Sequence, residues 1–170
     1  MIKLSVIDFG VKKVFSFNEF DLYWQYKNEL WKVEGCIPEK QTEVQSWYFS
    51  ILHSDVSFVR IYDTKLKQED DQVGFLFIAR GVDCHKDADS YIWDAFVLPD
   101  YRRQKIMSDA FQVFIQTHPG RYCLYLIDNN LPAIAFWKEQ FDKNLYEETD
   151  IDDYTGMETD SCHLHCYEKA

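Results

Sequence analysis

The amino-acid sequence predicts a mixed α/β domain. Three observations support this class: two helices with amphipathic spacing near the N-terminus, three consecutive β-like segments, and then a regular alternation of helix and strand. The expected order is strand, two helices, a meander of three strands, helix, strand, helix, strand. Because no repeat, low-complexity tract or linker interrupts this order, we predict a single domain over residues 1–170.

The N-terminal part is expected to hold a strand over residues 2–8 and two capped helices. Ser16 and Glu19 form an SxxE capping box before the first helix, and Thr42 and Gln45 form a TxxQ box before the second. The apolar spacing assigns these side chains to inward faces: Phe20, Tyr23, Trp24, Val44, Trp47, Tyr48, Ile51 and Leu52. Core packing is the favoured role of the aromatic side chains among them, with one wall of a ligand pocket as the alternative.

The middle of the chain is expected to build most of the sheet. Two segments with strand-like apolar patterns, residues 56–63 and 72–80, lie on either side of a charged, hydrophilic segment. This arrangement predicts a β-hairpin. Residues 90–98 form a third central strand, and a helix follows from about Gln104 to Thr117.

The C-terminal part continues with a strand, a helix and a strand. The unbroken apolar segment RYCLYLI (121–127) is typical of a strand buried on both faces. Asn130 is expected to cap a helix that runs to about Phe141, and SCHLHCYEK (161–169) is expected to form the last strand after an acidic loop.

Charge and hydropathy exclude several partners. The chain carries 18 Lys and Arg against 29 Asp and Glu, a net charge of −11, which would repel nucleic acid and attract cations. Solubility alone explains such a charge, and a cationic amine or a basic peptide also fits its sign. No apolar run is long enough to span a membrane, and the N-terminus lacks a signal-peptide pattern, so we expect a cytoplasmic protein without a membrane partner.

The five cysteines predict neither a disulfide nor a metal site. Their number is odd and their spacing is irregular, which suits reduced thiols in a cytosolic protein, and Cys123 is expected to serve in buried packing. The sequence CHLHC (162–166) resembles a metal motif. In a strand, however, its two cysteines face one side and its two histidines the other, so we expect no metal.

The most informative segment is VLPDYRRQKIMSDAF (97–111). An apolar strand ends at Pro99, and a basic turn with Arg102, Arg103 and Lys105 leads into an amphipathic helix. The free N–H groups and the positive dipole end of a helix N-terminus favour phosphate. This turn therefore predicts a site for an anionic ligand.

Together with NLPAIAFWK (130–138), this segment resembles the GNAT superfamily of N-acetyltransferases, and within it a branch of predicted acetyltransferases. The phosphate loop of that family has Gln or Arg, two residues, Gly, one residue, and Gly or Ala; Arg102 fills its first place. The second signature, NxxAxxFY, is matched by Asn130, Ala133, Phe136 and Trp137. The resemblance covers about residues 73–141.

The resemblance implies a fold and an activity. The fold would be a central mixed, mostly antiparallel sheet of about six or seven strands flanked by about four helices. The activity would be transfer of an acetyl group from acetyl-CoA to a primary amine of a small molecule or peptide in a ternary complex. The alternative is a degenerate, non-catalytic GNAT-fold module for ligand binding or interaction. The acceptor, the acyl chain length and a homodimeric state are left open.

The resemblance also implies cofactor contacts. The pantetheine arm would pair with the backbone near Val97 and Leu98, and Asn130 would meet it. The phosphates would lie on the turn and the first helical N–H groups, formed by Arg102, Arg103, Gln104, Lys105, Ile106, Met107 and Ser108.

Two departures from the family pattern bear on these contacts. Lys105 and Met107 occupy the places of the two glycines, where a Cβ atom hinders close approach of the phosphate. Trp137 stands where many members carry a proton-donating tyrosine, and indole is no practical acid. Tyr122, Tyr125 or solvent would then supply the proton.

The attacking amine must lose its proton, so a base is expected in the cleft. Asp94 is the first candidate, and Tyr91, as a group that orders water, is the second. A solvated or arginine-paired carboxylate is the structural alternative for Asp94. A backbone N–H near Val97 is expected to hold the oxyanion.

Overall fold

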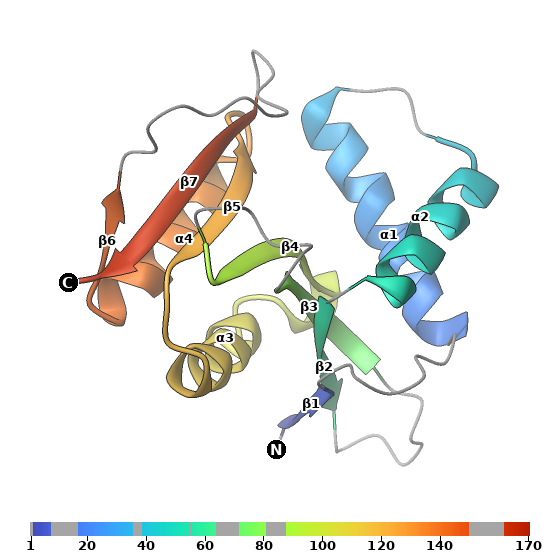
Figure 1. Ribbon diagram of the computed structural model, residues 1–170. Coiled ribbons are helices and arrows are strands. Elements are labelled where there is room, and N and C mark those ends of the chain that lie inside the picture. Colours follow the sequence, from blue (N-terminus) through green and yellow to red (C-terminus); the bar gives the residue numbers. More distant parts are fainter. Residues whose placement is uncertain are drawn as a thin grey trace.

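A seven-stranded mixed sheet with the strand order β1-β2-β3-β4-β5-β7-β6 forms the centre of the molecule (Figure 1). The computed structural model describes residues 2–7, 17–35, 39–54, 56–63, 72–80, 88–149 and 162–170. The strands are β1 (Ile2–Ile7), β2 (Val56–Asp63), β3 (Gln72–Ala79), β4 (Ser90–Val97), β5 (Tyr122–Ile127), β6 (Tyr146–Thr149) and β7 (Cys162–Lys169). All neighbouring strands are antiparallel except β4 and β5, which agrees with the expected mixed, mostly antiparallel sheet.

Four α-helices cover the two faces of this sheet. They are α1 (Phe17–Glu34), α2 (Gln41–His53), α3 (Ile106–Thr117) and α4 (Leu131–Lys143). Side chains of α1 and α2 pack with one face of β2, β3 and β4, whereas α3 and α4 share a second core with the opposite face. In Figure 1 the first pair lies on the right and the second pair on the left. The expected fold class is confirmed, and the extent of a single domain over residues 1–170 stays a prediction.

The sheet opens at a fork between β4 and β5. Their parallel register covers only Ser90–Ile92 on β4 and Tyr122–Leu124 on β5, and no further pair joins these two strands although residues 88–149 are all described. On the other side of β4, Phe77 pairs with Asp94 but Ile78 pairs with Ile92, so the register skips Trp93. A β-bulge of this kind bends the strand. The bend and the fork coincide at Asp94.

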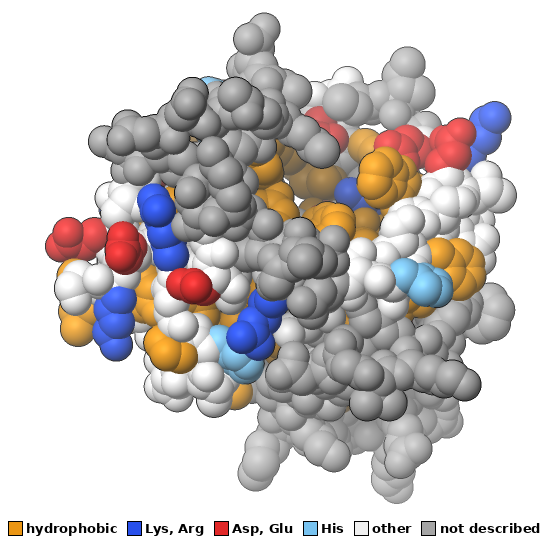
Figure 2. All heavy atoms as spheres, in the orientation of Figure 1, with side chains coloured by type: hydrophobic (Ala, Val, Ile, Leu, Met, Phe, Trp, Pro, Cys, Tyr) orange, Lys and Arg blue, Asp and Glu red, His pale blue; other side chains and the backbone are white. Residues whose placement is uncertain are grey.

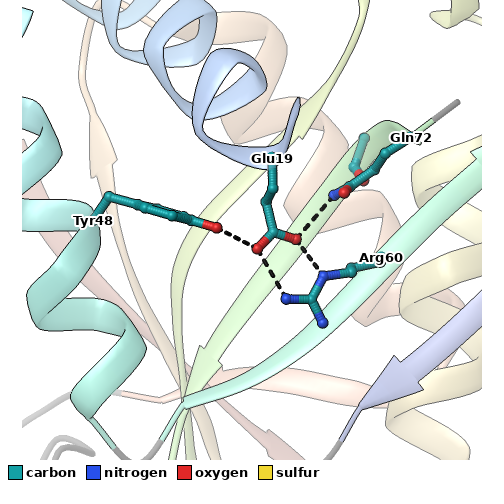
Figure 3. A network of polar contacts seen from close by, with 5 residues as sticks. Glu19, Tyr48, Arg60 and Gln72 are labelled. Carbon is teal, nitrogen blue, oxygen red and sulfur yellow. Dashed lines mark hydrogen bonds and ion pairs between the residues drawn. The ribbon is translucent and has the colours of Figure 1, made fainter. Parts of the chain in front are cut away.

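A buried polar network fixes α1 and α2 to the sheet (Figure 3). The Glu19 carboxylate, from the first turns of α1, is fully buried and forms an ion pair with Arg60 on β2, with one nitrogen–oxygen distance of 2.9 Å. Tyr48 on α2 donates a hydrogen bond to the same carboxylate, and the amide of Gln72 on β3 donates another at 3.2 Å. Glu19 thus joins four elements rather than acting only in the expected capping box, whose Ser16 lies outside the described residues.

Two expectations for α2 are wrong. The helix begins one residue before Thr42, and the Lys40 N–H donates to the Glu43 carboxylate at 3.0 Å, so the capping pair is not Thr42 and Gln45. Trp47 is 57% exposed instead of inward, whereas the other four expected core positions of this helix are buried. The apolar face of α2 is narrower than the sequence spacing indicated.

The C-terminal part contains a strand that the sequence analysis assigned to an acidic loop. Strand β6 pairs with β7 at the edge of the sheet, from Tyr146 opposite Lys169 to Thr149 opposite Cys166. An edge strand has one solvated side and tolerates charged side chains. The glutamates at positions 147 and 148 are exposed there.

The expectation of reduced thiols is wrong for two of the cysteines. Cys123 and Cys166 form a disulfide, because β5 and β7 pair antiparallel with these residues directly opposite each other and their Cα atoms 4.2 Å apart. Both side chains are fully buried, as expected for Cys123. Cys162 is a free thiol. The thiol argument for a cytoplasmic location therefore no longer holds, and that location stays a prediction.

None of the described helices combines the length and the apolar character that a membrane span requires.

Candidate active site

The basic turn after β4 takes an unusual backbone path. A short 3-10 turn, Pro99–Tyr101, follows the strand, and α3 then begins at Ile106, two residues later than expected. Arg103 and Lys105 both have φ of 61°, and ψ of Lys105 is 10°, which places it in the left-handed region. Glycine adopts this region without a steric penalty. Lys105, at the place of a glycine in the family pattern, therefore has a backbone conformation that glycine adopts readily.

A cavity of about 620 Å³, here called the turn cavity, lies between this turn and α4. Arg103 and Lys105 line it and have no ion pair among the described residues, whereas Lys143 on its wall is paired with Glu139. Ser108 and Gln140 add polar groups, and their side chains are hydrogen-bonded at 2.5 Å. The cavity thus offers positive charge and polar groups at a helix N-terminus, which suits a phosphorylated ligand.

Arg102 points toward α1 and not only toward the turn cavity. Its guanidinium contacts the Glu29 carboxylate at 2.6 Å, and its Nε donates to the Val97 carbonyl at 2.8 Å. The adjacent Leu98 N–H is bonded to the Val73 carbonyl on β3. Because successive residues of a strand alternate in direction, Val97 directs its N–H and C=O away from β3, toward the fork. A ligand that pairs with Val97 as an added strand would have to displace Arg102.

Two smaller cavities continue from the turn cavity toward the fork. The middle cavity, about 310 Å³, shares Val97, Arg102 and Pro132 with the turn cavity. The inner cavity, about 100 Å³, lies between β4 and β5 and shares Tyr26, Leu30, Ala95 and Asn130 with the middle one. The three cavities therefore adjoin one another from the basic turn to the fork.

The space between α1 and β5 is visible from outside. Figure 2 shows a hollow there, lined mainly by hydrophobic side chains and with acidic side chains along its upper rim. The described part of the hollow thus combines a mainly apolar lining, which includes a basic side chain, with acidic side chains above it and to its upper right.

Asp94 is the buried carboxylate at the end of this series. It lines the inner cavity, and only 6% of the residue is exposed. The Tyr26 hydroxyl donates to its Oδ1 at 2.5 Å, whereas its Oδ2 has no hydrogen-bond partner. Native structures seldom leave a buried carboxylate oxygen without a partner. The exception here adjoins a cavity.

The surroundings of Asp94 favour a proton on the carboxyl. Burial raises its pKa above the ordinary value of 3.8, and the charge of Lys27 and hydrogen bonds from Tyr26 and Tyr23 lower it in part. The Lys27 ammonium lies 5.6 Å from the ring centres of both tyrosines. A carboxyl with a raised pKa that faces a cavity is the arrangement expected of a general base or acid.

Most of the candidate residues from the sequence do meet at these cavities. The turn cavity is lined by Val97, Arg102, Arg103, Lys105, Ile106, Met107, Ser108 and Phe136, and the inner cavity by Asp94, Asn130, Ala133 and Trp137. Asn130 also caps α4, as predicted, by accepting from the Ala133 N–H at 3.4 Å.

Other candidates lie away from the cavities. Gln104 bonds through its side chain to the Asp100 carbonyl, Leu98 is packed between the two cores, and Tyr91 contacts the Tyr125 ring at 6.0 Å. None of these three lines the turn, middle or inner cavity.

Sequence reasoning missed two residues of α1 at this site. Tyr26 and Glu29 reach the fork and the basic turn respectively, from a helix for which core packing was the favoured role and one wall of a ligand pocket the alternative. The spacing of Tyr26, three residues after the inward-facing Tyr23, was the signal that could have found it. Nothing in the sequence signals the contact with Asp94, which is 68 residues away.

The two histidines of the CHLHC strand contact carboxylates. In β7 His163 pairs with Asp128 at 2.7 Å and His165 with Glu148 at 2.5 Å. Among the described residues, no group of three potential ligands is close enough to hold a metal ion.

The sheet with its fork, the basic turn and the buried carboxylate together define an acyltransferase type of architecture, and comparisons with known proteins agree. The family model described as the acetyltransferase (GNAT) family matches residues 20–142, more than half of the chain. The chain therefore belongs to the GNAT acetyltransferase family. A search of curated protein sequences gave no match.

Solved structures with the same fold span nearly the whole chain. A GNAT-family acetyltransferase from Staphylococcus aureus has 16% identity and a TM-score of 0.61, with 98% of each chain covered. The ribosomal-protein-S18-alanine N-acetyltransferase from Escherichia coli has 13% identity and a TM-score of 0.58, covering 100% of this chain and 96% of its own. An acetyltransferase from Streptococcus agalactiae has 13% identity and a TM-score of 0.61, with 96% of each chain covered. At such identities the likeness shows the fold.

Proposed function

We propose that the protein transfers an acetyl group from acetyl-CoA to a primary amine by direct transfer in a ternary complex. The observation that carries the proposal is the series of adjoining cavities that leads from the cationic turn to Asp94, a buried carboxylate with one unpartnered oxygen. The fold is shared with a solved N-acetyltransferase that acts on an alanine of a ribosomal protein, which supports amine acylation as the reaction.

The binding of acetyl-CoA would use the turn and middle cavities. Arg103 and Lys105 would neutralise phosphate charge, and the N–H groups at the start of α3 would donate to phosphate oxygens. Val97, with its N–H and C=O directed toward the fork, would pair with the amide groups of the pantetheine arm after the arm displaces Arg102 from the Val97 carbonyl. Acetyl-CoA supplies the activated thioester; the residues of the chain orient it.

The chemistry would take place at the fork. The Asp94 carboxylate would accept a proton from the amine through Oδ2, directly or through water, because its Oδ1 is occupied by Tyr26. The oxyanion would be held by a backbone N–H near Val97, which is directed away from β3. The acidic rim in Figure 2 supports an acceptor that carries positive charge.

Titration calorimetry with acetyl-CoA tests the binding part of the proposal. We expect binding that Arg103→Ala weakens and makes less dependent on salt, because one phosphate contact is lost. Lys138→Ala is the matched control, since it removes the same charge from an exposed position on α4 outside the three cavities. Absence of binding at millimolar acetyl-CoA would exclude the enzyme and favour the degenerate ligand-binding module.

A screen of primary amines with acetyl-CoA tests the reaction. Release of free thiol together with the mass of an acetylated amine is the expected result. The screen covers small cationic amines and peptides with a free N-terminal amine. If the protein binds acetyl-CoA but acetylates none of them, the proposed reaction is contradicted and the assignment of the acetyl-CoA site is not.

A further inference from the structure

The family position that often holds a proton-donating tyrosine is occupied by Trp137 in this chain. Its side chain is buried, with 6% exposure, and its ring packs edge-on against Phe111 and Phe136. The indole N–H is a hydrogen-bond donor that does not ionise in the useful range. If the reaction is to release a thiol, another group has to supply the proton.

Three tyrosine hydroxyls lie on the strands and helix nearest the fork. Tyr122 is fully buried on the α3 and α4 side, and its hydroxyl donates to the His118 carbonyl, so it faces away from the cavities. Tyr125 lines the inner cavity but neither the middle cavity nor the turn cavity. Tyr26 lines both the inner and the middle cavity, and the middle cavity is the one that adjoins the cationic turn. Of these three described tyrosines, only Tyr26 lines the cavity that lies between Asp94 and the path by which a thioester would arrive.

We propose that Tyr26 of α1 donates the proton to the departing thiolate and that it acts as a pair with Asp94. This inference rests on the proposed acetyl transfer. The hydrogen bond of 2.5 Å from the Tyr26 hydroxyl to Asp94 Oδ1 links the proton donor to the proton acceptor.

The proton transfers balance over one turnover. The amine nitrogen attacks the acetyl carbon, a C–N bond forms, and the nitrogen gives a proton to Asp94 Oδ2. The C–S bond then breaks, and the Tyr26 O–H gives its proton to the sulfur. The tyrosinate recovers a proton from the carboxyl of Asp94, so both side chains return to their starting state, and the products are an amide and a thiol.

The pairing also sets the order of the two transfers. Burial raises the pKa of Tyr26 well above its ordinary value, and the negative charge of Asp94 raises it further. The high pKa keeps the proton on Tyr26 before the attack. When Asp94 has taken the proton of the amine, this negative charge is gone. Tyr26 then becomes a stronger acid at the stage when the thiolate leaves.

The test compares Tyr26→Phe with Tyr23→Phe in single-turnover acetyl transfer. Tyr23 is the matched control because it also lies near Asp94, one turn earlier on α1, but lines none of the three cavities. We expect Tyr26→Phe to slow transfer from acetyl-CoA by about 100-fold or more, with acetyl-CoA affinity unchanged, as for loss of a general acid. Tyr23→Phe should slow it much less than Tyr26→Phe, because Tyr23 acts on the pKa of Asp94 but lines none of the three cavities that the thioester would enter.

A second acyl donor separates proton donation from a structural role. The acetyl thioester of thionitrobenzoate has a far more acidic thiol, which leaves without protonation. The loss in Tyr26→Phe should shrink with this donor, whereas a misplaced Asp94 would slow both donors equally.

The outcomes distinguish this inference from the proposed function. Equal effects of the two tyrosine variants, or a loss below about 3-fold in Tyr26→Phe, would overturn the role of Tyr26 alone, since a general acid contributes far more. Absence of transfer by the unsubstituted protein would overturn the proposed function and this inference with it.

Discussion

Glu19 and Asp94 are both buried carboxylates that accept a hydrogen bond from a tyrosine, yet their surroundings differ. Both oxygens of Glu19 are engaged, by Arg60, Tyr48 and Gln72, and no cavity described above adjoins it. Asp94 has one oxygen bonded to Tyr26 and one without a partner, at the inner cavity. A satisfied buried network rigidifies a structure, whereas an incomplete one at a cavity is poised for a ligand. The Glu19 carboxylate fixes α1 to the sheet. The Asp94 carboxylate is contacted by Tyr26 because α1 is held in that position.

The largest expected effect is on activity, in Asp94→Asn. The variant keeps the acceptor for Tyr26 but loses the base, so we expect acetyl transfer to fall by about 10²–10⁴-fold. The free energy of unfolding should be unchanged or higher, because a buried charge with an unpartnered oxygen is removed. Steady-state kinetics and urea unfolding measure the two quantities. A variant that loses stability and keeps its rate would reverse the roles assigned to the two carboxylates.

In contrast to Asp94→Asn, Glu19→Ala is expected to lower the free energy of unfolding. It removes the carboxylate that pairs with the buried Arg60 guanidinium, and breaking a buried ion pair costs about 3–5 kcal/mol. The double variant Glu19→Met with Arg60→Met is the control. It removes both charges and should recover most of the loss in urea unfolding, while the rate of the folded fraction stays near that of the unsubstituted protein. A loss below about 1 kcal/mol would mean that the network contributes little, as for a surface ion pair.

The pH dependence sharpens the comparison at Asp94. Burial raises the pKa of this carboxyl, while Tyr23, Tyr26 and Lys27, all on α1, face it and lower the pKa in part. Since the base must be ionised, the rate should fall as the pH drops through a value above the ordinary carboxyl range.

The same shift makes a prediction for stability. A raised pKa means that the folded protein binds the proton more tightly than the unfolded chain. The stabilising contribution is therefore present at low pH and is lost as the pH rises through the folded pKa. The unfolding free energy of Asp94→Asn relative to the unsubstituted protein should increase over that range.

Lys27→Met tests the charge that opposes the effect of burial. Removing this ammonium should move the acid limb of the pH–rate profile to higher pH, because the ionised carboxylate loses its attraction. Lys32→Met, at an exposed position on the same helix, is the matched control and should leave the limb in place. A shift to lower pH in Lys27→Met would show that the charge of Lys27 does not lower the pKa of Asp94.

The parts of this site that the sequence predicted are those encoded locally. The amphipathic spacing after the basic turn correctly predicts the buried face of α3, including Ala110, Phe111 and Phe114, and Asn130 caps α4 as its sequence context indicates. Both follow from interactions within a few residues along the chain.

The parts that it did not predict depend on contacts between distant segments. The disulfide needs β7 to lie beside β5, so that Cys123 and Cys166, 43 residues apart, come into register. The Tyr26 contact with Asp94 likewise needs α1 to cross the sheet at the fork. Strand β6 was missed for a related reason, since its pairing with β7 outweighs the low strand propensity of its glutamates.

The smallest expected effect concerns the backbone of the basic turn, in Lys105→Gly. With φ of 61°, a side chain at this position costs about 1–2 kcal/mol in the left-handed region, part of which glycine recovers, so we expect a gain of about 0.5–1 kcal/mol in urea unfolding. Lys105→Ala is the matched control because it removes the same charge but keeps a Cβ atom. Both variants should bind acetyl-CoA less tightly than the unsubstituted protein if the ammonium contacts phosphate. If the family glycine serves close approach of the phosphate, the glycine variant should bind more tightly than the alanine variant; equal affinities would show that the charge of Lys105 matters here and the space around its Cβ does not.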